Sequence, residues 1–325
     1  HDLFALTESE LNWRAAHDRL RALGYGLRER YSPDWVPSWR RAGHDDAWLE
    51  ENDFLWSSFE DCVEHATTID AVRLSDNTPV AVQLKPPSAE SVRILRALAS
   101  EHIASDPRNH ACPLLDLRPL DDSGSVLVAV YPLARDWRMP PMTLVAEAIT
   151  FIDQLLEGFA FLHEHNIAHR DIAARNIMMD PSPLFLNGTN PLRNLTRVPL
   201  SERPPTHTRL FPAPGHALRY WIIDFGLSTI FASRADRRPV IWEGGPCDFP
   251  ECWEEKDGKR TPTAPYDAFK ADVHSLGALL QRYFLPSLPA LAPLVHAMTS
   301  PSPDARPDLD DCVRAFRAIG RGLST

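Results

Sequence analysis

Alternation of apolar and polar residues in the first half of the chain predicts a small antiparallel sheet. The runs "DAVRL" (70–74) and "VAVQL" (80–84) alternate in this way, and the turn-like "SDNTP" lies between them. This is the pattern of two strands joined by a hairpin. A helical pattern follows over residues 88–104, and a continuous apolar run at 125–133 predicts a buried strand.

From about Pro141 the pattern becomes helical. Apolar residues recur there at three- and four-residue spacing, at Leu144, Ala148, Ile152, Leu155, Phe159 and Leu162. The run "YWIIDFG" (220–226) predicts another strand, and three more helices are predicted over 267–284, 289–300 and 309–320. The expected fold class is therefore α+β, with a small β-rich part followed by a mainly helical part.

Two further segments flank or interrupt these elements. A helix is predicted from the capping-box pair Thr7 and Glu10 to a C-terminal stop at Gly24. Five of the nine Trp residues fall within the first 56 residues, which predicts a segment packed on the body of the protein. Eight Pro residues fall within residues 181–219, which are predicted to form a surface insertion.

Composition excludes some classes of function. A formal net charge of −10 and a pI near 5.7 argue against nucleic-acid binding and against an anionic membrane surface, because both require a positive field. No apolar run approaches the roughly 20 residues that span a bilayer. The five Cys residues are scattered without a CxxC pair, which favours reduced thiols. We expect a soluble protein that is cytoplasmic or otherwise intracellular.

Candidate chemistry lies in two short motifs. The first is His169-Arg170-Asp171 with Asn176 five residues after the Asp, and the second begins at Asp224, which opens an Asp-Phe-Gly run at the end of the predicted strand. Phosphoryl transfer requires a carboxylate that orients the attacking hydroxyl and oxygen ligands that hold Mg²⁺. Together these motifs resemble the catalytic core of eukaryotic protein kinases.

The resemblance implies a bilobed fold, with ATP and Mg²⁺ as cofactors and a nucleotide and a protein substrate or docking partner as ligands. It implies catalytic roles for Asp171, Arg170, Arg175 and Asn176. It also implies that Asn176 and Asp224 are the metal ligands, with Asp224 counted among the cofactor-binding residues. The "AAR" run that ends at Arg175 is the pattern of tyrosine kinases, but the rest of the chain leaves serine, threonine and tyrosine acceptors open.

Three later residues extend the resemblance. Glu251 follows Phe-Pro where the family carries Ala-Pro-Glu, and Arg306 stands where the family's buried Arg pairs with that Glu. Asp272 stands where the family holds the backbone of the catalytic loop.

The resemblance also divides the chain. We expect an extension at 1–56, an N-lobe at 57–133, and a C-lobe at 134–325 that contains the insertion 181–219. The Trp-rich extension and the insertion are similar to those of divergent kinase-like proteins of fungi.

The predicted N-lobe departs from the family pattern. Val80-Ala81-Val82 is followed by Gln83 where the family has Lys. Lys85 lies on the same strand face roughly 6–7 Å further on, and it either replaces that Lys or is a solvated strand end. The implied cofactor-binding residues are Ala81, Gln83, Lys85 and Tyr131.

Two other features of this region bear on nucleotide binding. Glu90 either partners the lysine or is a solvated charge in the first turn of its helix. No glycine occurs between Gly43 and Gly124, so a glycine-rich phosphate loop is missing. Acidic residues lie where the triphosphate is expected, namely Glu60, Asp61 and Glu64.

Two functions of different kinds follow. The first is a protein kinase-like phosphotransferase that moves the ATP γ-phosphate to a protein hydroxyl. The alternative is a pseudokinase that acts as a binding or scaffold module with weak or no transfer. Small-molecule kinases share the Asp and Asn pattern but lack the Glu251 and Arg306 pairing, so they rank last.

Overall fold

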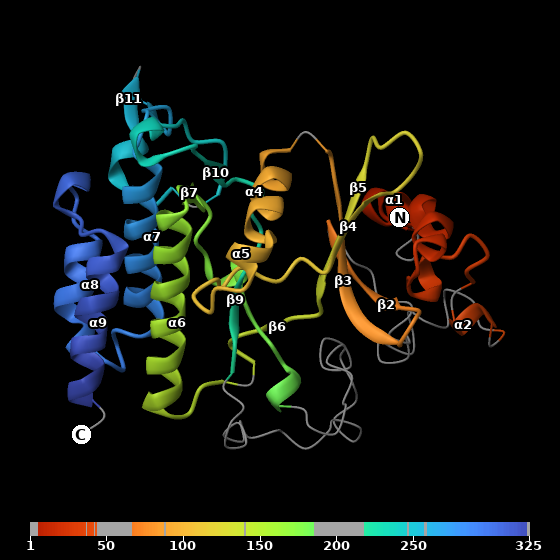
Figure 1. Cartoon of the computed structure of the whole chain (residues 1–325), viewed down its shortest axis with the longest axis horizontal. Coiled ribbons are helices and arrows are strands. Elements are labelled where there is room, and N and C mark those ends of the chain that lie inside the picture. Colours follow the sequence, from red (N-terminus) through yellow and green to blue (C-terminus); the bar gives the residue numbers. More distant parts are fainter. Residues whose placement is uncertain are drawn as a thin grey trace. The chain divides into compact units, whose positions relative to one another are not determined.

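The chain forms two compact units, each with its own set of elements (Figure 1). The computed structural model describes residues 6–36, 38–41, 43, 67–87, 89–139, 141–184, 218–245, 247–256 and 259–323. The first unit takes in residues 1–87, 113–135 and 180–217, and the second takes in 88–112, 136–179 and 218–325. The first is built on a curled sheet and the second is mainly helical, which confirms the predicted α+β class. The predicted lobe boundaries stay predictions.

The first unit contains a five-stranded sheet with the order β1-β2-β3-β5-β4. Its strands are β1 (Tyr25–Gly26), β2 (Thr68–Arg73), β3 (Thr78–Lys85), β4 (Asp116–Pro119) and β5 (Leu127–Pro132). The predicted hairpin is confirmed, because β2 pairs antiparallel with β3 from Thr68↔Gln83 to Arg73↔Thr78. Asn77 adopts φ +57° in the turn, a conformation that Asn tolerates better than most residues.

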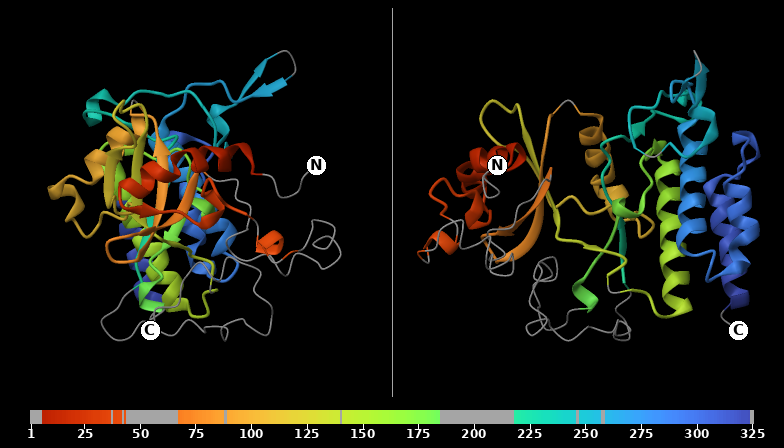
Figure 2. Two further views of the ribbon diagram at one scale, coloured as in Figure 1. Left: turned by 90° about the vertical axis from the view of Figure 1, so that its right-hand side faces the viewer. Right: turned by 180° about the vertical axis from the view of Figure 1, so that it is seen from behind.

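Helix α1 (Glu8–Ala22) covers one face of this sheet, as both views in Figure 2 show. Its predicted capping box is present, and Glu10 also receives two hydrogen bonds from the fully buried Arg30. Apolar side chains of α1, among them Trp13 and Leu20, pack with Val80 and other inward residues of β2, β3 and β5. Apolar burial therefore joins the N-terminal helix to the sheet, and the buried ion pair adds directional contacts.

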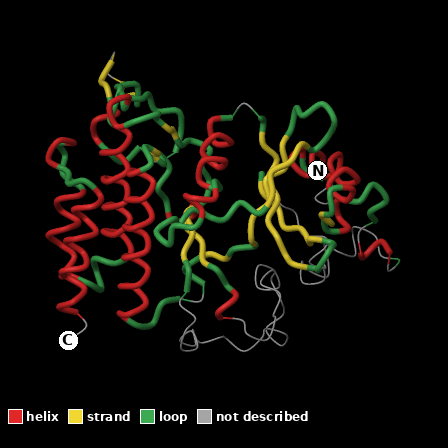
Figure 3. The backbone as a smooth tube through the Cα atoms, in the orientation of Figure 1, coloured by secondary structure: helices red, strands yellow, loops and turns green. Residues whose placement is uncertain are grey.

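The second unit contains the helices that the apolar spacing predicts. They are α4 (Glu90–Leu98), α5 (Glu101–Ala104), α6 (Val145–Glu164), α7 (Ala268–Tyr283), α8 (Ala292–Met298) and α9 (Leu309–Leu323). The helix predicted over 88–104 divides at Ser100, which adopts an extended conformation as the N-cap of α5. The long helices α6, α7 and α9 lie side by side with α8 (Figure 3). None of the helices in the described residues has the length and apolar character needed to cross a membrane.

Short strands in the second unit carry the loops of interest. Strand β8 (Ile177–Met179) pairs antiparallel with β9 (Tyr220–Ile222), and β7 (Ile167–Ala168) pairs with β10 (Thr229–Ile230). β6 (Arg135–Asp136) completes the order β6-β8-β9. A separate hairpin is formed by β11 (Glu254–Lys256) and β12 (Lys259–Thr261). Because β8 and β9 are antiparallel, the residues before β8 and after β9 meet at one end of the ladder.

Candidate active site

A buried carboxylate fixes the backbone of the loop that follows β7. Asp272, on α7 and 1% exposed, accepts hydrogen bonds from the backbone N–H groups of His169 at 2.7 Å and Arg170 at 2.8 Å. His163 Nε2 lies 3.1 Å from the same carboxylate. Arg170 has φ +66°, which costs an L-residue roughly 1–2 kcal/mol. The contacts of Asp272 hold this conformation and confirm the role that the resemblance implies for it.

The loop brings three of the four predicted catalytic residues together. Asn176 Nδ2 donates to Asp171 Oδ2 at 2.8 Å and to the Asp171 carbonyl oxygen at 2.9 Å. Arg175 Nη2 donates to Asp171 Oδ1 at 2.7 Å. Asp171 is 6% exposed, so both of its carboxylate oxygens are held by donors in a buried position. The carboxylate is therefore fixed in one orientation.

The ladder register brings the two predicted metal ligands to the same end of the β8–β9 pair. Ile177 pairs with Ile222, and just beyond that pair the Ile223 N–H donates to the Asn176 carbonyl oxygen at 3.0 Å. Asp224 is the next residue along the chain. Two residues that are far apart in the sequence are thus brought to the same end of one short ladder.

The side chains of these two residues offer hard oxygen ligands. Because Asn176 Nδ2 donates to Asp171, the Asn176 Oδ1 atom is the remaining side-chain atom that can bind a cation. Asp224 is exposed, has φ +62°, and accepts a hydrogen bond from the Gly226 N–H at 3.1 Å. One amide oxygen and one carboxylate, completed by phosphate oxygens and water, form a donor set that suits Mg²⁺. The residues present therefore fit this metal.

The remaining predicted catalytic residue, Arg170, points toward the segment at 241–245. Its guanidinium donates to the Ile241 carbonyl oxygen at 2.6 Å, to Glu243 Oε2 at 3.1 Å and to the Tyr266 hydroxyl at 3.3 Å. Burial opposes the charge of Arg170, but the hydrogen bonds to Tyr266 and Glu243 outweigh burial and raise its pKa. Arg170 therefore orders a neighbouring loop, and the structure gives it no contact with the Asp171 carboxylate.

A glycine lies directly against Asp171. A Cβ atom at Gly245 would lie 3.1 Å from Asp171 Oδ1 and 3.0 Å from Leu227 Cδ1. Gly245 also has φ +77°, which an L-residue adopts only with strain. The backbone of this segment thus passes the carboxylate so closely that only glycine fits without a shift.

The predicted pair of Glu251 and Arg306 is confirmed. Arg306 is 1% exposed and donates from Nη1 to Glu251 Oε1 at 2.5 Å and from Nη2 to Oε2 at 2.8 Å. Its Nε donates to the Ser300 carbonyl oxygen and its Nη1 to that of Lys270. This fork of bonds anchors the end of the segment that passes Asp171.

The prediction of reduced thiols is wrong for one pair of Cys residues. A disulfide joins Cys247 to Cys252 across the turn that contains Pro250. The turn brings together two residues whose spacing matches no standard motif, which is why the sequence did not reveal them. Cys112 and Cys312 are buried, and burial raises the pKa of the Cys312 thiol to about 12. Cys62 lies outside the described residues.

The predicted cofactor-binding residues of the first unit share one face of its sheet. Ala81 pairs with Tyr131 across β3 and β5, and cross-strand partners point to the same side. Gln83 and Lys85 follow at two-residue steps on that side. The opposite face carries the apolar core under α1. The interpretation of Lys85 as a solvated strand end is wrong, because Lys85 is 7% exposed and belongs to β3.

Glu90 is exposed in the first turn of its helix, as the interpretation as a solvated charge predicts, and it also accepts two hydrogen bonds. It is the first residue of α4, and its Oε1 accepts hydrogen bonds from the Thr229 hydroxyl at 3.1 Å and from the Ile230 N–H at 3.0 Å. It therefore ties α4 to β10, the strand that follows the Asp-Phe-Gly run. The other acidic residues of interest, Glu60, Asp61 and Glu64, lie outside the described residues.

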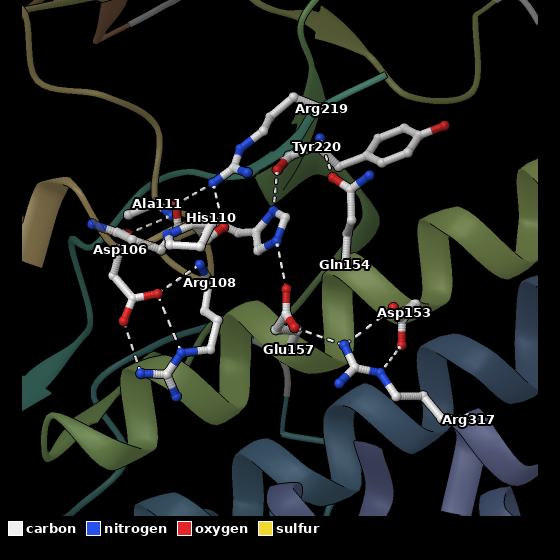
Figure 4. Close-up of polar contacts among 12 residues, drawn as sticks. Asp106, Arg108, His110, Ala111, Asp153, Gln154, Glu157, Arg219, Tyr220 and Arg317 are labelled. Atoms are coloured by element: carbon white, nitrogen blue, oxygen red, sulfur yellow. Dashed lines mark hydrogen bonds and ion pairs between the residues drawn. The ribbon is translucent and has the colours of Figure 1, made fainter. Parts of the chain in front are cut away.

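Sequence reasoning missed two residues that support the strand leading to Asp224. Gln154 of α6 and His110 both hydrogen-bond to the backbone of Tyr220, as Figure 4 shows. The available signal was weak: Gln154 and Gly158 interrupt an apolar helix at a spacing of four residues, which places them on one face.

The sequence matches one protein-family model. The model describes protein tyrosine and serine/threonine kinases, and the match covers residues 133–203, which include α6 and both sides of the Asp171 loop. The curled sheet and the helical C-terminal region are consistent with the bilobed α+β fold of that family.

Proposed function

We propose that this chain, a member of the protein kinase-like superfamily, binds ATP with Mg²⁺ and transfers the γ-phosphate to a hydroxyl group of a protein. The observation that carries the proposal is the orientation of Asn176. Its amide nitrogen donates to Asp171, which leaves Oδ1 as an oxygen ligand at the ladder end that Asp224 follows.

The residues divide the chemistry between them. Asp171 accepts the hydrogen bond of the acceptor hydroxyl and takes up its proton, and Arg175 and Asn176 hold the carboxylate in place. Asn176 Oδ1 and the Asp224 carboxylate would hold Mg²⁺. Bound ATP and Mg²⁺ would supply the phosphoryl group and offset its negative charge.

A second function, a binding or scaffold module with weak or no transfer, is favoured by two observations in the first half of the chain. Gln83 stands where the family carries its lysine. Glu90, which could have partnered a lysine, is engaged by Thr229 and Ile230. Both observations concern phosphate handling, so they weaken the case for transfer more than the case for nucleotide binding.

Nucleotide binding is tested by thermal unfolding with ATP, with and without Mg²⁺. A ligand present at about 100 times its Kd stabilises the native state by roughly 2.7 kcal/mol. We expect Mg²⁺-dependent stabilisation that Asp224→Asn removes, while Asp236→Asn, a change at an exposed acidic residue, retains it. No stabilisation at millimolar ATP in either condition would end the proposal.

Transfer is tested by incorporation of labelled phosphate into the chain itself and into a general protein substrate. We expect Asp171→Asn to abolish incorporation and Gln83→Ala to change it little. Unchanged incorporation in the Asp171 variant would reveal a contaminating kinase. Mg²⁺-dependent binding without incorporation would establish the binding-module alternative, and analysis of the phosphorylated residues would identify the acceptor.

A further inference from the structure

The strand that leads to Asp224 is short and lies at the edge of its sheet. β9 has three residues, and β8 covers only one of its two sides. On the open side, Ile222 donates to the His110 carbonyl oxygen at 2.7 Å and accepts from the Cys112 N–H at 2.9 Å. Because alternate residues point the same way, the backbone groups of Tyr220 also face this open side.

Two side chains pair with those backbone groups. Gln154 Oε1 accepts from the Tyr220 N–H at 3.0 Å, and Gln154 Nε2 donates to the Leu218 carbonyl oxygen at 2.8 Å. A side-chain amide has the same donor and acceptor as a peptide unit, so it substitutes for a neighbouring strand. His110 Nδ1 lies 3.0 Å from the Tyr220 carbonyl oxygen and must carry the proton there, because a carbonyl only accepts.

The surroundings are shaped to keep these side chains in place. A Cβ atom at Gly158 would lie 2.6 Å from His110 Cβ, so α6 needs glycine at that position to let His110 approach. Arg219 donates to the carbonyl oxygens of Pro107 and Asn109, which fastens the segment carrying His110 to β9 (Figure 4). The edge of β9 is thus completed by a built arrangement, with His110 only 3% exposed.

The hydrogen bonds along β9 affect the position of Asp224, because Asp224 follows this strand after one residue. Asp224 holds φ +62°, and the Ile223 N–H between it and β9 donates to Asn176. The backbone bonds of Ile222 to residues 110 and 112 hold the end of β9 next to Asp224, and the side chains of Gln154 and His110 hold its other end at Tyr220, so together they fix the whole of this short strand. A shift of about 1 Å in a ligand or catalytic group can cost on the order of a hundredfold in rate.

We propose that Gln154 and His110 are positioning residues for Asp224, acting by completing the open edge of β9. The inference rests on the proposed role of Asp224 as a metal ligand. The chain thereby uses two side chains, from α6 and from residues 107–112, in place of a further strand.

Hydrogen exchange of the native chain and of matched variants tests this. His110→Asn keeps an N–H donor near the position of Nδ1, whereas His110→Leu and Gln154→Met remove the hydrogen bonds at similar volume. Losing a buried hydrogen bond should speed exchange in residues 218–226 by about tenfold in the two apolar variants, with His110→Asn within about threefold of native. Exchange in α7 should stay at its native rate.

The inference is overturned if His110→Asn and His110→Leu behave alike, or if α7 exchanges faster to the same extent as 218–226, since that is general destabilisation. A second measurement addresses the metal. The Mg²⁺ concentration that gives half of the ATP-induced rise in Tm should increase several-fold in His110→Leu but not in His110→Asn. A native chain without any Mg²⁺-dependent shift would refute the proposed function, while the exchange comparison would still decide the role of His110 and Gln154.

Discussion

Replacing Asp272 by Asn changes one atom and should destabilise the protein strongly. In the native chain the two carboxylate oxygens of Asp272 accept from two backbone N–H groups, those of His169 and Arg170. An amide has only one acceptor oxygen, so its NH₂ group would face one of these N–H donors in either orientation. One backbone donor would be left unpaired beside a residue that is 1% exposed.

The expected cost follows from these contacts. A hydrogen bond to a charged group contributes about 1.5–3 kcal/mol, and an unpaired buried donor costs roughly 1–3 kcal/mol more. We therefore expect Asp272→Asn to lower the free energy of unfolding by about 3–5 kcal/mol. With about 2.1 cal/mol/K of unfolding entropy per residue over 325 residues, this is a fall of roughly 4–7 °C in Tm.

The same helix offers a matched control. Asp267 is the N-cap of α7 and accepts from the Phe269 and Lys270 N–H groups through one oxygen. Asn is an equally good N-cap, so Asp267→Asn should change stability by less than about 0.5 kcal/mol. Thermal and urea unfolding of both variants provide the assay. The reasoning is refuted if Asp272→Asn lies within about 1 kcal/mol of native, or if Asp267→Asn costs as much.

Other predictions concern the segment after the Asp-Phe-Gly run and the pH dependence of stability. Arg306→Lys should cost at least about 2 kcal/mol in urea unfolding, because Lys cannot reproduce the fork to Glu251, and native-like stability would contradict this. Glu243→Gln should cost less than about 1 kcal/mol, because Glu243 is 69% exposed and water screens its pair with Arg170; a loss above about 2 kcal/mol would contradict this. Burial and the nearby Arg306 lower the pKa of His274 below its usual 6.5, so the unfolded chain binds this proton first and stability should fall as pH drops from 6.5 towards the lowered value. His274→Asn should flatten the dependence of Tm on pH in that window, and an unchanged slope would rule out this contribution.

The sequence alone determined most of the helices and strands of the second unit. It also determined the positions of the short motifs that resemble those of protein kinases. Apolar spacing predicted α6, α7 and α9 because a helix shows its buried face every three to four residues. The sequence also predicted the pairing of Glu251 with Arg306 and the role of Asp272, because the short motifs around these residues resemble those of protein kinases.

Only the tertiary structure decided the contacts that depend on segments far apart in the chain. Lys85 looks like a solvated strand end beside two Pro residues, yet it is only 7% exposed, and no local pattern in the sequence shows this burial. The hydrogen bonds of Glu90 join residues 139 and 140 positions apart, and no local pattern encodes such a distance.

The support of β9 by Gln154 and His110 illustrates the same limit. Each residue lies beside other polar residues in its own segment and does not stand out from them. The role of each becomes visible only when folding brings it to the open edge of a three-residue strand. Local sequence determines which backbone a segment adopts, because propensity and periodicity act over a few residues. Tertiary packing decides which backbone groups a side chain hydrogen-bonds, because the position of a strand depends on the fold of the whole chain.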